Sequence, residues 1–388
     1  MYPEKIREMQ EAIRGERLDG WLFCNFRHRD KLSDEILGLD PASANSRLWL
    51  YAVPDKGDAV GIVHTIERDS LGDLPGERVF YNGREELFSR LARLAGKRWA
   101  CHFSDTITAI SFLDAGTCSL FEQAGLIPVC AAGLLQRFKG LLGPADIEAH
   151  ERSACHLYAI VDSVWAEVRR VFARGTPLYE SDLQHLMLDE FKQRNLVTGH
   201  PPIVAAGVNS ANAHYSPAQR GALIAPGDII QLDLWARENS PGSIYADISW
   251  VGQYVADIPS EIEQAFENLL SAREGALQFI QEELQAGRRP TGADVDRKSR
   301  EILCRYGYGD AIRHRTGHGI DTEVHGSGVN IDSFEFPDTR RLLDGSCFSL
   351  EPGIYFEQFG MRTEIDVYIA DGKPVVSGGE RQFALLHC

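Results

Sequence analysis

Two acidic residues near the end of the chain lie in stretches that alternate as β-strands do. Glu351 follows Leu350 in one stretch and Glu364 precedes Ile365 in the next, so each carboxylate points away from the aliphatic face of its strand. Two such strands joined by a turn would bring both carboxylates to the polar face of one hairpin. There they would repel each other, and their pKa values would rise unless a cation lies between them. The pair therefore predicts a bound metal ion.

A second pair of alternating stretches carries two more acids. Asp233 follows Leu232 and Asp247 precedes Ile248, so these carboxylates also point away from an aliphatic face. His318 lies between the two pairs in the sequence, in a glycine-rich segment, and offers an imidazole nitrogen. Four inward carboxylates are too many for one buried cation. Together with one imidazole they suit a pair of divalent ions about 3.5–4 Å apart, with some carboxylates bridging both ions.

These five residues occur in a recognisable order and local context. Taken alone, an aspartate in a strand usually marks an edge or a turn, and a histidine in a glycine-rich loop is usually solvated. Together, the order Asp, Asp, His in Gly-His-Gly, Glu in Glu-Pro-Gly and Glu in Arg-Thr-Glu resembles the pita-bread metallopeptidases. These include methionine aminopeptidase, Xaa-Pro aminopeptidase and Xaa-Pro dipeptidase (prolidase), to which the resemblance is closest. It covers roughly the last two thirds of the chain, and the first third only in length and pattern.

The resemblance implies a role for each ligand. Asp247 and Glu364 would bridge the two ions, Asp233 would serve one ion, and His318 with Glu351 would serve the other. The ligand set suits manganese, with cobalt, zinc or iron as alternatives, because availability decides as much as affinity. Two divalent ions would lower the pKa of a shared water so that a bridging hydroxide forms near neutral pH.

Three residues are implied to act in catalysis. Glu351 would carry a proton from the attacking hydroxide toward the leaving amine. His214 matches the upstream histidine of the family, which donates a hydrogen bond to the substrate or intermediate. His325 matches the histidine that contacts the scissile carbonyl. As isolated residues, both histidines could also be ordinary loop residues.

Further residues are candidates for holding the substrate. Arg362 shares a strand face with the acid two positions later, so it would hold either that carboxylate or the C-terminus of the substrate. Arg340 and Arg341 are alternative carboxylate clamps, or simply surface charges. Tyr245 precedes an acidic ligand by two positions, so it would share the face of that ligand and line the pocket.

Positioning such a site requires two domains of an α/β (α+β) chain. Residues 1–137 alternate helical and strand patterns, which predicts a small mixed sheet with helical cover, creatinase-like by resemblance. Residues 138–146 contain the glycines and proline of a linker. Residues 147–388 would form the pita-bread domain, built from two α-α-β-β halves that are related by a pseudo-twofold axis and carry two acids each.

Helix signals precede each acidic hairpin. The first pair of helices is expected over 146–173 and 180–194, and the second pair over 260–286 and 293–306. Ser260 and Glu263 have the spacing of a capping box and should open the third helix.

Composition restricts the partners and the location. The chain has 388 residues and a formal net charge of −16, from 40 basic and 56 acidic residues, which argues against binding to nucleic acid or to an anionic membrane. Neither an apolar signal core nor a membrane-spanning apolar run occurs, so we expect a cytoplasmic enzyme. The resemblance implies a homodimer.

The sequence as a whole predicts a dinuclear metal-dependent exopeptidase that cleaves Xaa-Pro bonds, principally in dipeptides. An Xaa-Pro aminopeptidase acting on longer peptides is the close alternative. A creatinase-like non-peptidase hydrolase or a peptide-binding pseudoenzyme of the same fold would not need all five ligands, whereas a metal-bearing lyase of this fold is a further alternative. This chain also departs from the family pattern, since Gly326 stands where an acid is customary and the segment 234–243 is long.

Overall fold

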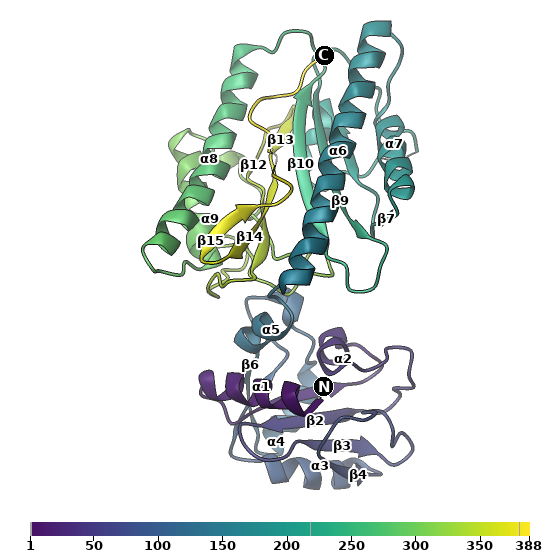
Figure 1. Cartoon of the computed structure of the whole chain (residues 1–388), viewed down its shortest axis with the longest axis vertical. Coiled ribbons are helices and arrows are strands. Elements are labelled where there is room, and N and C mark those ends of the chain that lie inside the picture. The colour runs from purple at the N-terminus through teal and green to yellow at the C-terminus, as the bar shows by residue number, and fades with distance from the viewer. Residues whose placement is uncertain (1, 218, 380) are drawn as a thin grey trace. The chain divides into compact units, whose positions relative to one another are not determined.

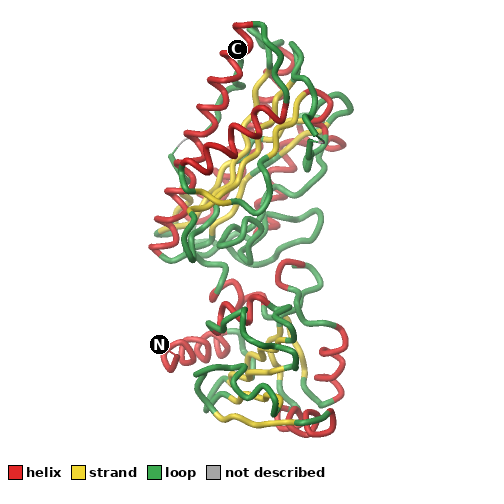
Figure 2. The backbone as a smooth tube through the Cα atoms, turned by 90° about the vertical axis from the view of Figure 1, so that its right-hand side faces the viewer, coloured by secondary structure: helices red, strands yellow, loops and turns green. Residues whose placement is uncertain are grey.

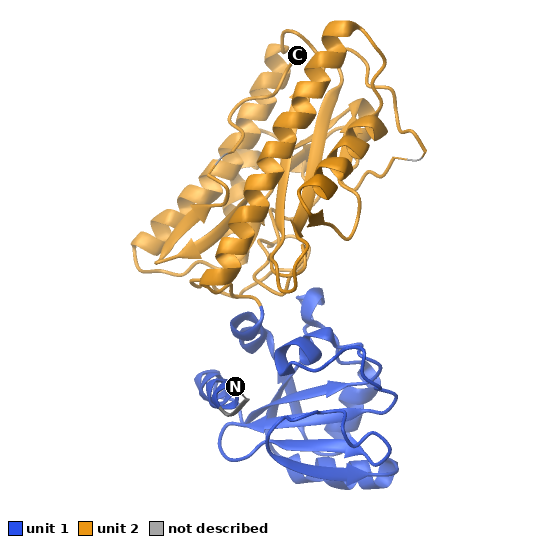
Figure 3. Cartoon of the chain, turned by 45° about the vertical axis from the view of Figure 1, so that its right-hand side comes forward, with its two compact units in different colours: residues 1–139 blue, residues 140–388 orange. Residues whose placement is uncertain are grey.

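The computed structural model describes residues 2–217, 219–379 and 381–388, and the chain divides into two compact units. The first comprises residues 1–139 and the second residues 140–388 (Figure 3). No helix within the described ranges combines the length and the apolar character needed to span a membrane.

The N-terminal unit is built on one six-stranded mixed sheet with the order β4-β3-β2-β1-β5-β6. Trp21 and Phe23 of β1 pack into one apolar cluster, and Leu22 between them packs into another on the opposite face. Both faces of the sheet are therefore buried, as predicted for a sheet with helical cover. Its elements are α1 (Tyr2–Gly15), β1 (Gly20–Asn25), α2 (Lys31–Leu37), β2 (Trp49–Pro54), β3 (Val60–His64), β4 (Glu77–Tyr81), α3 (Arg84–Leu91), β5 (Arg98–Cys101), α4 (Ala115–Gln123), β6 (Ile127–Cys130) and α5 (Ala132–Phe138).

The C-terminal unit consists of two halves with the same order of elements, as predicted (Figure 1). In each half, a long and a short helix precede antiparallel strands, and the helices lie outside the strands (Figure 2). The first half contains α6 (Pro144–Arg174), α7 (Glu180–Gln193), β7 (Leu196–Val197), β8 (Ile203–Ala206), β9 (Ile229–Glu238) and β10 (Ala246–Gln253). The second contains α8 (Ser260–Gln285), α9 (Gly292–Arg305), β11 (Cys347–Leu350), β12 (Gly353–Tyr355), β13 (Gly360–Arg362), β14 (Ile365–Ala370) and β15 (Lys373–Val376).

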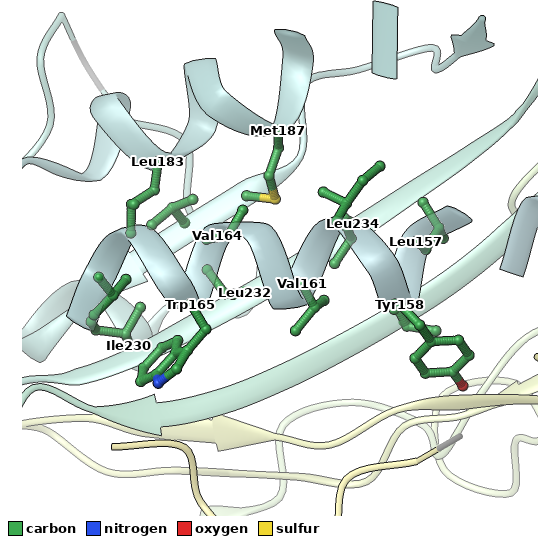
Figure 4. Close-up of a cluster of buried hydrophobic side chains, with 14 of the residues drawn as sticks. Leu157, Tyr158, Val161, Val164, Trp165, Leu183, Met187, Ile230, Leu232 and Leu234 are labelled. Atoms are coloured by element: carbon green, nitrogen blue, oxygen red, sulfur yellow. The ribbon is translucent and has the colours of Figure 1, made fainter. Parts of the chain in front are cut away.

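The apolar face of β9 packs against α6 and α7. Figure 4 shows Ile230, Leu232 and Leu234 of this strand beside Val164 of α6 and Met187 of α7, all within one buried cluster. Strand alternation then turns the intervening residues of β9 to the opposite face. This packing fixes the direction in which Asp233 points.

Two predicted features, a helix cap and a linker, differ from the structure. Ser260 is the first residue of α8, but Pro259 occupies the N-cap position, and no side chain caps this helix. The predicted capping box is therefore wrong. A true capping box opens α9, where Thr291 and Asp294 satisfy each other's backbone N–H groups. Helix α6 begins at Pro144, inside the segment 138–146 that was expected to be a linker.

Candidate metal centre

Asp233 and Asp247 come from the paired strands β9 and β10. The antiparallel register places Asp233 opposite Ser249 and Asp247 opposite Trp235. The two acids are therefore diagonal neighbours on one face of the hairpin. Ile248 on the other face belongs to the buried apolar cluster, as the alternation predicted.

Glu351 and Glu364 lie where the second hairpin is interrupted. The sequence predicted two continuous strands, but β11 and β12 are separate strands, as are β13 and β14. The register is nevertheless the same on both sides of the interruption, with Leu350 opposite Ile365 and Gly353 opposite Arg362. Glu351 therefore faces Glu364 across the hairpin. Their backbone N–H groups bond outside this hairpin, that of Glu351 to the Thr316 carbonyl at 2.7 Å and that of Glu364 to the Ser249 carbonyl at 3.1 Å.

His318 reaches the site from the long loop between α9 and β11. Its backbone N–H donates to Ser349 Oγ at 3.0 Å, and its carbonyl accepts from the Ser349 N–H at 2.9 Å. Close contact with β11 requires the preceding glycine, since a Cβ on Gly317 would lie 2.0 Å from the Ser349 carbonyl oxygen.

Three fully buried aspartates hold this loop in place without regular secondary structure. Asp296, Asp332 and Asp338 are each 0% exposed. Each accepts hydrogen bonds from backbone N–H groups of the loop, as in the 2.9 Å contact from Thr316 N to Asp296 Oδ1. A loop with its donors satisfied in this way can present an imidazole at a fixed position.

The five predicted ligands lie together. His318 Nε2 is 3.4 Å from Glu351 Oε1 and 3.6 Å from Asp247 Oδ2. One ligand atom each from Asp247, His318 and Glu364 lie within 4.8 Å of one another. Asp233 joins them through Ser249, whose Oγ is 3.2 Å from Asp233 Oδ1 and 2.8 Å from Glu364 Oε2.

Two oxygens of this cluster have no hydrogen-bond partner in the part of the chain that the structure describes. Asp247 Oδ1 and Glu364 Oε1 are buried and accept no hydrogen bond among the described residues. A buried carboxylate oxygen without a donor is costly, and oxygen-rich ligation with one imidazole suits a divalent cation. The donor set therefore fits a metal ion held by Asp247, His318 and Glu364.

The electrostatics of the cluster support this fit. Burial raises the pKa values of Asp247 and Glu364 well above their usual range, and repulsion from the neighbouring carboxylates adds to the effect. Burial also raises the pKa of Glu351 to about 7. For His318, burial and the nearby His325 lower the pKa well below its usual value, which keeps the imidazole neutral. A cation would replace the protons that these acids otherwise retain.

Arg362 lies inside the cluster, with its donors directed to protein groups. Its guanidinium bonds Asp233 Oδ2, and it donates to Ser249 Oγ and the Tyr355 hydroxyl, both at 3.1 Å. The distance from its Nε to Glu351 Oε2 is 3.7 Å. Of the two roles left open by the sequence, the structure supports holding a carboxylate of the protein, which here is Asp233.

The remaining predicted site residues take different positions. The His325 ring lies 4.3 Å from that of His318, centroid to centroid. Burial, then Arg315 and His214, lower the pKa of His325 to about 4, so His214 is close enough to act on it electrostatically. Tyr245 is buried, and the guanidinium of Arg237 lies 5.5 Å from its ring centroid.

His314 was missed by the sequence interpretation. Its Nε2 lies 2.8 Å from the Tyr355 hydroxyl and its Nδ1 lies 2.6 Å from the Arg315 carbonyl oxygen. Burial lowers the pKa of His314 to about 3 and raises that of Tyr355 to about 12. The neutral imidazole therefore accepts from the phenol, which in turn accepts from Arg362. The sequence offered one signal for His314, namely that it lies four residues before the predicted ligand His318.

Asp366 lies beside the predicted ligands but was not among the predicted site residues. It is fully buried, and its Oδ2 accepts a 2.7 Å hydrogen bond from the Asp247 backbone N–H. Burial raises its pKa well above the usual range. Its alternation with apolar residues on β14 resembles that of the predicted ligands, and no sequence signal distinguished it from them.

The arginines near the site differ in whether their guanidinium donors are already bonded to protein groups. Arg340 donates to both oxygens of Asp338 and to the carbonyls of Ser327 and Gly328, so its role here is structural. The guanidinium of Arg315 makes no hydrogen bond within the described ranges. Its ion-pair distance to Asp332 is 4.0 Å, and its side chain is 24% exposed.

Comparisons with known proteins agree with this arrangement. A model of metallopeptidase family M24 matches residues 152–371, more than half of the chain. The probable dipeptidase PepE of Mycobacterium tuberculosis strain H37Rv is 26% identical over 285 residues, which cover 72% of this chain and 68% of that protein. The Xaa-Pro dipeptidase of Lactobacillus delbrueckii subsp. lactis is 30% identical over 173 residues, which cover 43% of this chain and 41% of that protein.

A solved structure shares the whole architecture. The crystal structure of the dipeptidase PepE from Mycobacterium ulcerans has a TM-score of 0.73 at 21% identity, covering 100% of this chain and 97% of that one. This likeness confirms the predicted pita-bread fold with its additional N-terminal domain. From the match over its catalytic half and from this fold, the chain belongs to metallopeptidase family M24.

Proposed function

We propose that the protein hydrolyses Xaa-Pro dipeptides with two divalent metal ions. The observation that carries the proposal is the buried cluster in which Asp247 Oδ1 and Glu364 Oε1 lack donors beside the neutral imidazole of His318. Asp233 and Glu351 complete the set of five ligands. The name of the Lactobacillus relative supports the choice of substrate.

When bound, the ions supply an activated water and polarise the scissile carbonyl. We assign Glu351 to proton transfer because its carboxylate lies 3.4 Å from the His318 imidazole, among the residues that would hold the ions. His325 is neutral in this range, and its ring lies against the ligand His318, where it can hydrogen-bond a substrate carbonyl. His214 is exposed, and we assign it to contact with the substrate or intermediate.

A dipeptidase must also bind a free C-terminal carboxylate. Among the arginines considered above, Arg315 has donors to spare, whereas Arg362 and Arg340 are engaged by protein groups. The positive charge of Arg315 also acts on the site. Burial is the main cause of the lowered pKa values of His318 and His325, and Arg315 lowers both further. We assign Arg315 as the candidate carboxylate clamp. Tyr245 remains a candidate pocket residue.

The proposal includes four further properties. Manganese is the preferred ion for an oxygen-rich site with one imidazole, with cobalt, zinc and iron as alternatives. The active form is a homodimer, and its location is the cytoplasm. Residues 147–388 form the catalytic domain, and residues 1–137 form the creatinase-like N-terminal domain.

The test compares hydrolysis of Xaa-Pro dipeptides with hydrolysis of Xaa-Pro-Xaa tripeptides, by chelated protein and after manganese is added back. Metal-dependent cleavage of the dipeptides alone is the expected result. Preference for tripeptides would move the protein to the Xaa-Pro aminopeptidases. Failure to cleave either, with metal bound, would overturn the Xaa-Pro proposal in favour of a lyase or a peptide-binding role.

A further inference from the structure

Glu180 is a buried acid on the first turn of α7 and does not belong to the metal cluster. Its side chain is wholly enclosed, with an exposure of 0%. Oε1 accepts from the Ala206 N–H at 2.8 Å and from Asn209 Nδ2 at 3.0 Å. Oε2 accepts from the Tyr215 hydroxyl and from the Ala222 N–H, both at 2.7 Å. Each oxygen thus accepts from one backbone and one side-chain donor.

These four donors belong to a single segment that connects β8 to β9. Ala206 is the last residue of β8, and Ala222 lies within the connection, before β9 begins at Ile229. One carboxylate therefore binds the segment where it leaves β8 and at three later points. The approach is close, because a Cβ on Gly221, where φ is +70°, would lie 2.9 Å from Glu180 Cβ.

His214 lies in this segment between two anchored neighbours. Tyr215, which follows it, is bound to Glu180 through its hydroxyl. The carbonyl of Ala213, which precedes it, accepts a 3.2 Å hydrogen bond from Arg362 of the metal cluster. The His214 imidazole itself is exposed and makes no hydrogen bond to any described residue. Its location is therefore set by its neighbours and by its backbone N–H, which donates to Asn212 Oδ1 at 3.1 Å, and not by contacts of its imidazole.

We propose that Glu180 is a positioning residue that places His214 at the metal centre. This inference rests on the proposed function, because it assigns Glu180 to the reaction through His214. The chemistry requires a carboxylate, since four donors need an acceptor-only group with two oxygens. A glutamine would turn its NH2 group toward two of those donors and would release part of the segment. Displacing a substrate-contacting group by about 1 Å can cost up to about a hundredfold in rate.

The experiment is a double-mutant cycle on the metal-loaded full-length protein with an Xaa-Pro dipeptide. Glu180→Gln should lower kcat/KM by about ten- to a hundredfold in the wild-type background. In the His214→Ala background the same change should cost less than about twofold, because the group that it positions is gone. Glu190→Gln is the matched control on α7, where Glu190 pairs with Arg194 at 3.1 Å; it should leave kcat/KM unchanged.

Equal losses in both backgrounds would overturn the proposal, as would full activity of Glu180→Gln or of His214→Ala. Tyr215→Phe, which removes one hydroxyl only, serves as the second variant if Glu180→Gln does not fold, and it should show the same dependence on His214. Melting temperature and metal content, measured for each variant, separate lost positioning from unfolding. If the wild-type protein cleaves no Xaa-Pro dipeptide, the proposed function has failed, and that result is distinct from any outcome of the cycle.

Discussion

Arg362 bonds Asp233, whereas Asp247 Oδ1 and Glu364 Oε1 have no partner in the described part of the chain. One predicted ligand is thus already neutralised by a cation of the protein, and two are not. A metal ion at Asp247, His318 and Glu364 replaces no existing ion pair. An ion at Asp233 competes with the guanidinium.

Metal binding should therefore occur in two unequal steps. Calorimetric titration of chelated protein with manganese is expected to give one tight equivalent followed by a weaker one. Arg362→Gln should tighten the second step, because it frees the carboxylate of Asp233. Two equal affinities in the wild-type protein, or a second step unaffected by Arg362→Gln, would contradict this assignment.

Asp247→Asn should affect activity and stability in opposite directions. Loss of a ligand is expected to reduce kcat/KM by on the order of a thousandfold and to lower the metal content. The metal-free variant should melt at a higher temperature than the metal-free wild type, because one of several mutually repelling buried carboxylates becomes neutral. Activity assays, metal analysis and thermal unfolding in chelator check the three expectations. A lower melting temperature for the metal-free variant would argue against a repulsive cluster.

The stability of the metal-free protein should depend on pH through Glu351. Its carboxyl has an ordinary pKa of 4.5 and a pKa of about 7 in the fold. Between these values the native state holds more protons than the unfolded state, so the free energy of unfolding falls as the pH rises through this window. Relative to Glu351→Gln, the wild type should lose on the order of 3 kcal/mol from pH 4.5 to above 7. Urea unfolding of both chelated proteins across this range measures the difference. A difference that is constant with pH would refute the expectation.

Arg315 should distinguish free carboxylates from amides. For an Xaa-Pro dipeptide, Arg315→Gln is expected to reduce kcat/KM by about ten- to a hundredfold, the loss of one charged hydrogen-bonded contact. For the corresponding dipeptide amide, the same variant should match the wild type. Arg313→Gln is the control, since Arg313 donates to the Asp310 carbonyl at 2.6 Å. Equal losses on acid and amide would show that Arg315 does not bind the substrate carboxylate.

In the two hairpins that carry the acidic residues, the sequence could predict which side chains share a strand face, because alternation is a local property. The aliphatic residues around Asp233 and Glu364 lie in buried clusters, as expected. The interruption at Glu351 could not be predicted, since it depends on how β12 and β13 pair apart from β11 and β14. The capping box at Ser260 failed because Pro259, with its extended backbone, takes the N-cap position in its place.

The hydrogen-bond partners of the site residues could not be predicted from the periodicity of the sequence. His314 meets Tyr355 across 41 positions of sequence, and Glu180 meets Ala222 across 42. Each of these contacts lies within one half of the C-terminal unit and depends on how a loop folds onto the rest of that half, which no local pattern reports. For Arg340 the sequence suggested a guanidinium that could bind the substrate carboxylate. In the structure this guanidinium is buried and bonded to Asp338.

The shared register of the interrupted hairpin limits how its length can vary. Glu351 and Glu364 face each other only while the pairing from Leu350–Ile365 to Tyr355–Gly360 is preserved. One residue inserted into either strand would exchange a carboxylate with its aliphatic neighbour. The tip at 356–359, beyond the last pair, can lengthen or shorten without that exchange. We expect natural insertions and deletions in this hairpin to be confined to the tip.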